Sequence, residues 1–159
     1  MNKKAFLVLG VVLAVIVGIA LLQSIQQSKP TNESSGLIVS QNAIYIADQT
    51  PGQIISVAVA RLEKSGFVVI HEDNAGQPGK ILGTSGLLAA GENKNLPPIS
   101  LSRLIKDGET LYAMIHIDDG DGAFDVAKDK PALDSVSGEP VMMIFVVSKD
   151  ATEPGAVSL

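Results

Sequence analysis

Two stretches of sequence decide the expected fold: residues 110–118, which read TLYAMIHID, and residues 67–71, which read FVVIH. Each is short, rich in β-branched and aromatic residues, and preceded by a glycine-containing turn sequence, a pattern typical of β-strands. Neither shows the period of a helix. Further apolar runs of strand length occupy residues 37–39, 44–47, 53–62, 80–83, 99–105 and 141–148.

Turn-forming residues separate these runs at intervals of roughly 10–15 residues, which is the pattern of an antiparallel sandwich or open barrel. The Asp107-Gly108 pair predicts a β-hairpin that joins residues 99–105 to residues 110–118. We therefore expect an all-β fold, a single antiparallel β-sandwich of the Ig-like or cupredoxin-like kind. It should span residues 37–150 and be followed by a short tail, residues 151–159.

The N-terminal part of the chain has a different character. Lys3 and Lys4 precede Ala5–Leu22, a run of 18 residues without a polar side chain. As a helix it would be about 27 Å long, close to the hydrocarbon thickness of a bilayer. We expect a transmembrane helix over residues 5–25 and a flexible polar linker over residues 26–36.

The two lysines should keep residues 1–4 in the cytoplasm and place the C-terminal domain outside it, in a periplasm or at the cell surface. A cleaved signal peptide is the alternative. The apolar run is longer than a signal-peptide core, and no small-x-small cleavage site follows it. The chain therefore has the features of an uncleaved signal-anchor.

Composition excludes several classes of function. The 159 residues include no cysteine, so disulfides, thiolate metal sites and catalytic thiols are absent. The net charge is −5, and no basic cluster follows Lys4, so nucleic acid is not an expected partner. Residues 83–86 (GTSG) lack the spacing of a nucleophile elbow, and there is no phosphate-binding loop. We expect no catalytic residues and no enzymatic activity.

The two histidines of the chain, His71 and His116, each end a predicted strand. Met114 shares a strand face with His116, and Asp118 lies on the same face. If the two strands pair, His71, His116 and Met114 could bind Cu or Zn, although a blue-copper centre would also need a thiolate. The alternative is that each imidazole hydrogen-bonds the backbone or a neighbouring Asp at a strand end.

A second candidate metal site is the acidic segment DDGDGAFD, residues 118–125. Calcium prefers six to eight oxygen ligands, and we expect Asp119, Asp121 and Asp125 to supply them if the ion binds. The spacing departs from an EF-hand, because Ala123 and Lys130 occupy ligand positions. A plain acidic turn is the alternative.

The order of the central motifs also carries a resemblance. Residues 67–71 (FVVIH), 81–85 (ILGTS), 88–93 (LAAGEN), 99–101 (ISL) and 111–118 (LYAMIHID) follow one another along the chain. This succession resembles a domain of unknown function that recurs in secreted and cell-surface proteins of halophilic archaea and in some membrane-anchored bacterial proteins. The resemblance covers most of residues 37–147. It implies an extracytoplasmic β-sandwich and no established activity.

These observations predict a membrane-tethered domain with a non-enzymatic binding or structural role at the cell surface. Its partners would be the membrane, through the Ala5–Leu22 helix, and another surface protein, a surface polymer or a second copy of the chain. A copper- or zinc-handling module using His71 and His116 is the alternative function. A calcium-stabilised adhesion-type domain is the third.

Overall fold

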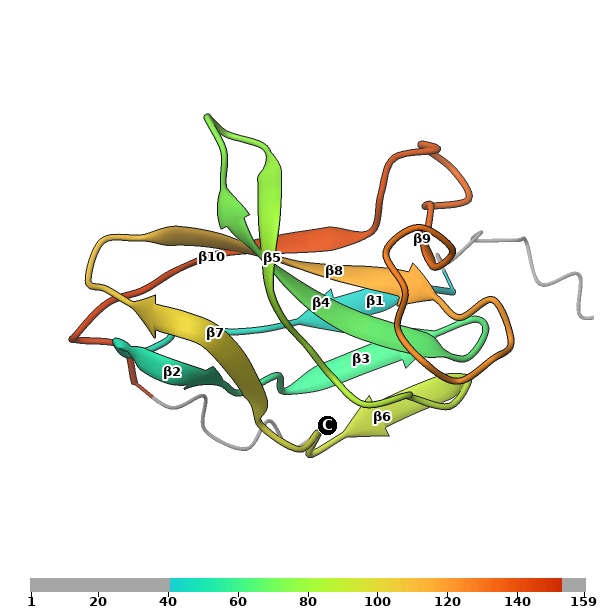
Figure 1. The fold of residues 1–159 in the computed structure, drawn as a ribbon, viewed down its shortest axis with the longest axis horizontal. Coiled ribbons are helices and arrows are strands. Elements are labelled where there is room, and N and C mark those ends of the chain that lie inside the picture. The colour runs from blue at the N-terminus through green and yellow to red at the C-terminus, as the bar shows by residue number, and fades with distance from the viewer. Residues whose placement is uncertain (1–40, 153–159) are drawn as a thin grey trace, which may run out of the picture. The chain divides into compact units, whose positions relative to one another are not determined.

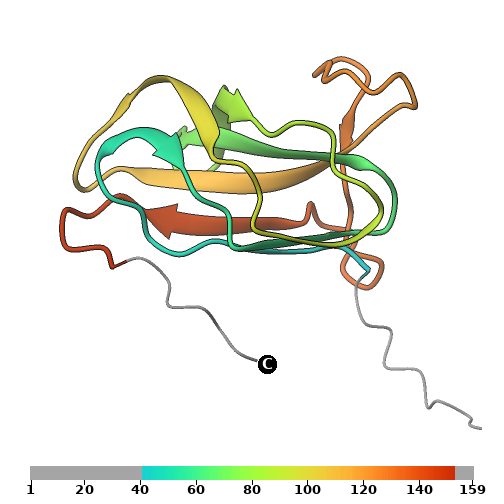
Figure 2. The ribbon, with the colours of Figure 1, turned by 90° about the horizontal axis from the view of Figure 1, so that it is seen from below.

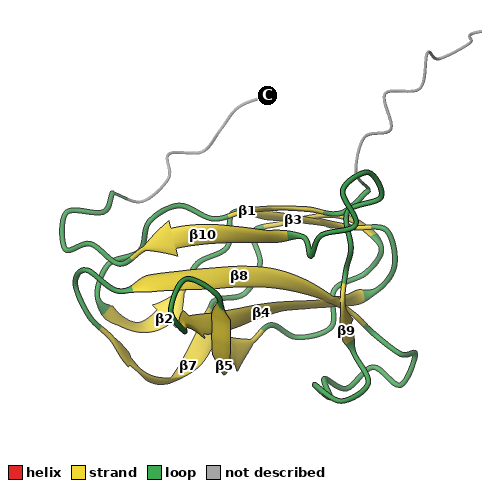
Figure 3. Ribbon diagram, turned by 90° about the horizontal axis from the view of Figure 1, so that it is seen from above, coloured by secondary structure: helices red, strands yellow, loops and turns green. Residues whose placement is uncertain are grey.

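The computed structural model describes residues 41–152, which contain strands and loops but no helix (Figure 3). The predicted helix over residues 5–25, the linker over 26–36 and the apolar run at 37–39 lie outside the described residues. In residues 41–152 there is no helix that could cross a membrane. The strands are β1 (Ala43–Tyr45), β2 (Gly52–Ile55), β3 (Val59–Leu62), β4 (Gly66–Asp73), β5 (Pro78–Thr84), β6 (Gly91–Lys94), β7 (Ile99–Ile105), β8 (Thr110–Ile117), β9 (Lys130–Pro131) and β10 (Met142–Val146).

The strands form three antiparallel sheets that pack together (Figures 1 and 2). The largest sheet has the order β10-β8-β4-β5, with the short β9 beside β8. A second sheet has the order β1-β3-β6, and β2 pairs with β7 in the third. This arrangement confirms the expected all-β class with packed antiparallel sheets.

Strands β4 and β8 occupy the middle of the largest sheet and are buried on both faces. This double burial explains why their sequences are almost continuously apolar instead of alternating with polar residues. Alternate residues of the two strands enter the main hydrophobic core: Val68, Ile70, Leu111, Ala113 and Ile115. The residues between them are buried on the opposite face of the sheet, outside that core: Phe67, Val69, His71, Tyr112, Met114 and His116.

One predicted strand, residues 53–62, is in fact two, so the prediction of a single strand there was wrong. The chain leaves one sheet after β2 and joins another at β3. The buried Gln49 stabilises the break, because its Oε1 accepts a hydrogen bond from the Ser56 N–H at 2.9 Å. The apolar pattern gives no sign of this side-chain contact.

The predicted hairpin at Asp107-Gly108 was also wrong. The turn exists, with Gly108 at φ +83°, but β7 pairs with β2 while β8 pairs with β4 and β10. The Gly108 N–H donates to the Val147 carbonyl at 2.7 Å, so the turn is fixed by the chain after β10. The short strands β6 and β9 were not predicted.

Gly66 provides a test of the central pairing. It lies opposite Ile117, and a Cβ atom at Gly66 would overlap the carbonyl oxygen of His116. We expect Gly66→Ala to lower the free energy of unfolding by about 1–3 kcal/mol, as overpacking does. Urea denaturation of the full-length chain, followed by circular dichroism, measures the change. Gly86→Ala is the matched control, because a Cβ there meets nothing within 4 Å. Equal stability of the two variants would contradict this packing.

Candidate metal centre

His71 and His116 lie close together on the outer face of the largest sheet. Their ring centroids are 5.8 Å apart, and the ring planes differ by 21°. In the strand register His71 is opposite Tyr112, so His116 is four residues further along β8. Four residues of strand span about 13 Å. The two side chains must therefore extend toward each other along the sheet.

Each imidazole is held by one ring nitrogen. His71 Nδ1 is 2.9 Å from the carbonyl oxygen of Gly79, and His116 Nδ1 is 2.9 Å from that of Asp129. A carbonyl oxygen can only accept, so both Nδ1 atoms must carry the proton. In the neutral rings the Nε2 atoms are consequently unprotonated and have a free lone pair.

Both Nε2 atoms are buried and have no hydrogen-bond partner in the protein. In residues 41–152 no other buried side-chain nitrogen or oxygen atom lacks a hydrogen-bond partner. His71 is 7% exposed and His116 is 3% exposed. An unsatisfied buried acceptor costs about 1–3 kcal/mol, so two of them side by side need an explanation.

Met114 is the third residue of the predicted Cu or Zn site. It is 5% exposed and lies opposite Val69, midway in the register between the positions of His71 and His116. The carboxylates at the ends of these two strands, Asp73 and Asp118, each accept a hydrogen bond through Oδ1. Asp73 Oδ1 accepts from the Tyr112 hydroxyl at 2.9 Å, and Asp118 Oδ1 accepts from the Gly122 N–H at 3.0 Å.

The surroundings favour the uncharged imidazole at His116. Burial lowers the pKa of His116 below its ordinary value of 6.5, and the neighbouring His71 lowers it further. The hydrogen bond to the Asp129 carbonyl opposes the shift without reversing it. Phe124 packs edge-on against the ring at a centroid distance of 5.7 Å, and also against Phe67 at 5.4 Å. Apolar contacts thus cover part of the histidine pair.

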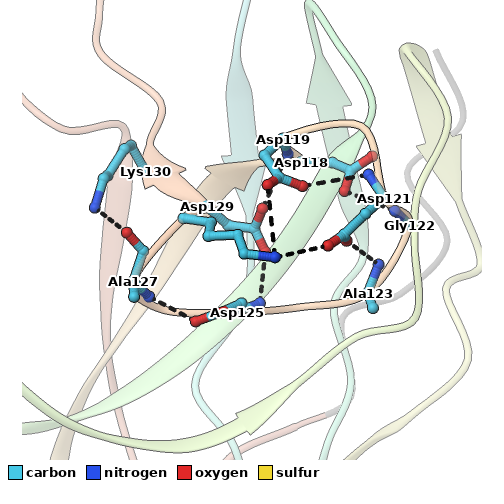
Figure 4. A network of polar contacts seen from close by, with 10 residues as sticks. Asp118, Asp119, Asp121, Gly122, Ala123, Asp125, Ala127, Asp129 and Lys130 are labelled. Atoms are coloured by element: carbon cyan, nitrogen blue, oxygen red, sulfur yellow. Dashed lines mark hydrogen bonds and ion pairs between the residues drawn. The ribbon is translucent and has the colours of Figure 1, made fainter.

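The segment that carries Phe124 is organised by a buried carboxylate that the sequence analysis missed. Asp129 is 0% exposed, and its two oxygens accept the N–H groups of Asp119 at 3.0 Å and Asp125 at 2.7 Å (Figure 4). Its own carbonyl anchors His116 Nδ1. In the sequence Asp129 stands between Lys128 and Lys130 and has the pattern of an exposed charge, so no sequence signal identifies it.

The acidic segment is brought together only in part. Single carboxylate oxygens of Asp118, Asp119 and Asp121 lie within 4.8 Å of one another, whereas Asp125 is outside this group. Asp125 Oδ1 accepts from the Ala127 N–H at 2.9 Å.

Lys128 already partners two of these carboxylates. Its Nζ lies 3.1 Å from Asp121 and 3.9 Å from Asp119. The pKa of Asp121 is lowered, first by the Ala123 N–H and then by Lys128, and the pKa of Lys128 is raised by Asp121. A lysine ammonium therefore occupies the position of a counter-ion here, and calcium binding stays a prediction.

The fold is an all-β sandwich. The buried histidine pair and Met114 form a candidate site for a metal ion with nitrogen and sulfur ligands. The chain belongs to the family DUF7282, a domain of unknown function, whose model matches residues 42–148. This membership confirms the resemblance to a domain of unknown function. Neither a curated protein nor a solved structure matches the chain.

Asp129→Asn tests how the segment over the histidines is held. The amide keeps one acceptor but places an N–H donor group against a backbone donor. We expect the free energy of unfolding to fall by about 1.5–3 kcal/mol, the contribution of hydrogen bonds to a charged group. Asp125→Asn, which affects one exposed turn, should change it by less than about 1 kcal/mol. Thermal denaturation of both full-length variants gives the comparison, and similar losses would rule out the proposed role of Asp129.

The lowered pKa of His116 predicts a pH dependence. In the unfolded chain His116 titrates near 6.5, and in the fold it titrates lower. The unfolded state therefore binds more protons between the two values, so the contribution to stability is full above about pH 6.5 and is lost as the pH falls. An NMR titration of the two imidazoles, assigned with His71→Gln, should place the His116 midpoint below 6.5. A midpoint at or above 6.5 would disprove the burial effect.

Proposed function

We propose that this domain binds a soft transition-metal ion, Cu(I), through His71 Nε2, His116 Nε2 and Met114 Sδ. The observation that carries the proposal is the pair of buried Nε2 lone pairs without a partner. Metal-binding histidines generally donate their other ring N–H to a carbonyl or carboxylate, which fixes the ring and its tautomer. His71 and His116 both have this second contact, through Gly79 and Asp129.

The separation of the rings suits a shared ion. A metal–nitrogen bond is about 2.0 Å and a ring nitrogen lies about 1.1 Å from its centroid, so one ion holds two centroids at most roughly 6 Å apart. The observed 5.8 Å falls within this limit. At this separation the nitrogen–metal–nitrogen angle would be wide but not linear, so the ion could also bind a third ligand, Met114.

The ligand types favour Cu(I) over other metals. A thioether is a soft ligand that selects Cu(I), whereas Zn²⁺ is usually bound by imidazole, thiolate, carboxylate and water, with no thioether among its ligands. The chain has no cysteine, and the three proposed ligands, His71, His116 and Met114, include neither a thiolate nor a carboxylate. Three neutral ligands would also leave the single positive charge of Cu(I) as the only charge in a largely apolar site.

Location outside the cytoplasm is part of the same proposal. It is supported by the Ala5–Leu22 apolar run behind Lys3 and Lys4. Metal binding is a non-enzymatic role, so the proposal is compatible with the expectation of a tethered surface domain. It does not require a catalytic residue.

The direct test is Cu(I) binding by the full-length chain in mild detergent, measured by competition with bicinchoninate. We expect one Cu(I) per chain. His71→Ala and His116→Ala should each weaken binding by more than about 100-fold, beyond the 10–100-fold effect of losing an outer contact. Met114→Leu should weaken it by at least about tenfold.

The acidic segment supplies the control for this test. An Asp119→Asn, Asp121→Asn double variant should bind Cu(I) as the unmodified chain does, because these carboxylates are not among the proposed ligands. Absence of stoichiometric binding would refute the proposal. So would binding that survives in both histidine variants.

A further inference from the structure

A methionine on the neighbouring strand extends the site to the surface. Met142, on β10, is directly opposite Met114 on β8. Side chains of residues opposite one another in antiparallel strands lie on the same face of the sheet. Met142 is 38% exposed whereas Met114 is 5% exposed, so the two thioethers run from solvent toward the buried histidines.

The backbone hydrogen bonds make this pair a close one. The Ile115 N–H donates to the Val141 carbonyl at 3.2 Å, a bond between the residues that flank Met114 and Met142. Such bonds flank a non-hydrogen-bonded pair, in which opposing Cα atoms are about 4.5 Å apart and the side chains are closest. A flexible thioether at Met142 can therefore reach an ion held at Met114.

The following residue shows that a methionine at this point of β10 can have a purely structural role. Met143 points to the other face of the sheet, where it packs against the hydrophobic core and its Sδ accepts a hydrogen bond from the Ile46 N–H at 3.4 Å. Met142 has no such packing role in the core. Its neighbours on the exposed face of β10 are Ile144 and Val146, neither of which offers a metal ligand.

We propose that Met142 is the entry ligand of the site, the thioether that first binds Cu(I) at the surface and passes it to Met114, His71 and His116. This inference rests on the proposed function. The transfer is an exchange of neutral ligands: a Cu–S bond to Met142 breaks as bonds to the inner group form. The ion stays Cu(I), so neither an oxidant nor a proton acceptor is needed.

The experiment compares rate with affinity. The full-length chain is loaded with one Cu(I), and its transfer to excess bathocuproine disulfonate is followed by stopped-flow absorbance. We expect Met142→Leu to slow the transfer by about tenfold, equivalent to about 1.4 kcal/mol on the barrier, while the equilibrium affinity changes by less than about threefold. Met143→Leu, the matched control on the opposite face, should transfer copper at the unmodified rate. Circular dichroism verifies that both variants fold.

The outcomes separate this inference from the proposed function. If the unmodified chain binds no Cu(I), both fail. If it binds Cu(I) but Met142→Leu transfers it at the unmodified rate, the entry role alone fails. If Met142→Leu loses as much affinity as Met114→Leu, Met142 is a permanent ligand and the entry role is likewise wrong.

Discussion

The pairing of β4 with β8 is the interaction on which the rest of the structure depends. Its register sets Phe67 opposite His116 and His71 opposite Tyr112, and so brings both imidazoles to one face. A shift of one residue on either strand would turn that strand's side chains to the other face. Burial on both faces opposes such a shift, because either strand would then exchange core residues such as Ile70 or Ile115 for a histidine. The same apolar packing that stabilises the sandwich therefore positions the candidate metal ligands.

The histidine pair destabilises a domain whose stability comes mainly from apolar packing and hydrogen bonds. Two buried acceptors without partners oppose folding by a few kcal/mol in total, a substantial part of the stability of an ordinary domain. Buried polar groups without hydrogen-bond partners tend to be found at functional sites. The anchoring of both Nδ1 atoms on backbone carbonyls means that the rings are already oriented before any ligand binds. A bound ion would satisfy both Nε2 atoms and remove the penalty.

The sequence predicted the sandwich and the site unequally well. Strand runs such as residues 99–105 were found because the apolar pattern of a strand is local. A shared metal site of His71 and His116 was predicted only on the condition that their strands pair, and the register shows that they do. The division of residues 53–62 between two sheets was not predicted, because it depends on the hydrogen bond between Gln49 and Ser56, which both lie outside the strands. The burial of Asp129 was not predicted, because it follows from the folding of residues 118–130 over the sheet. Its sequence neighbours are two lysines.

Both imidazoles and Met114 should bind one and the same ion. Copper K-edge X-ray absorption of the full-length chain carrying one equivalent of Cu(I) measures the ligands of that ion. We expect a first shell with two imidazole nitrogens, recognised by outer-ring scattering, and at least one sulfur that disappears in a Met114→Leu, Met142→Leu double variant. A shell of oxygen atoms without imidazole scattering, unchanged in that variant, would contradict this expectation.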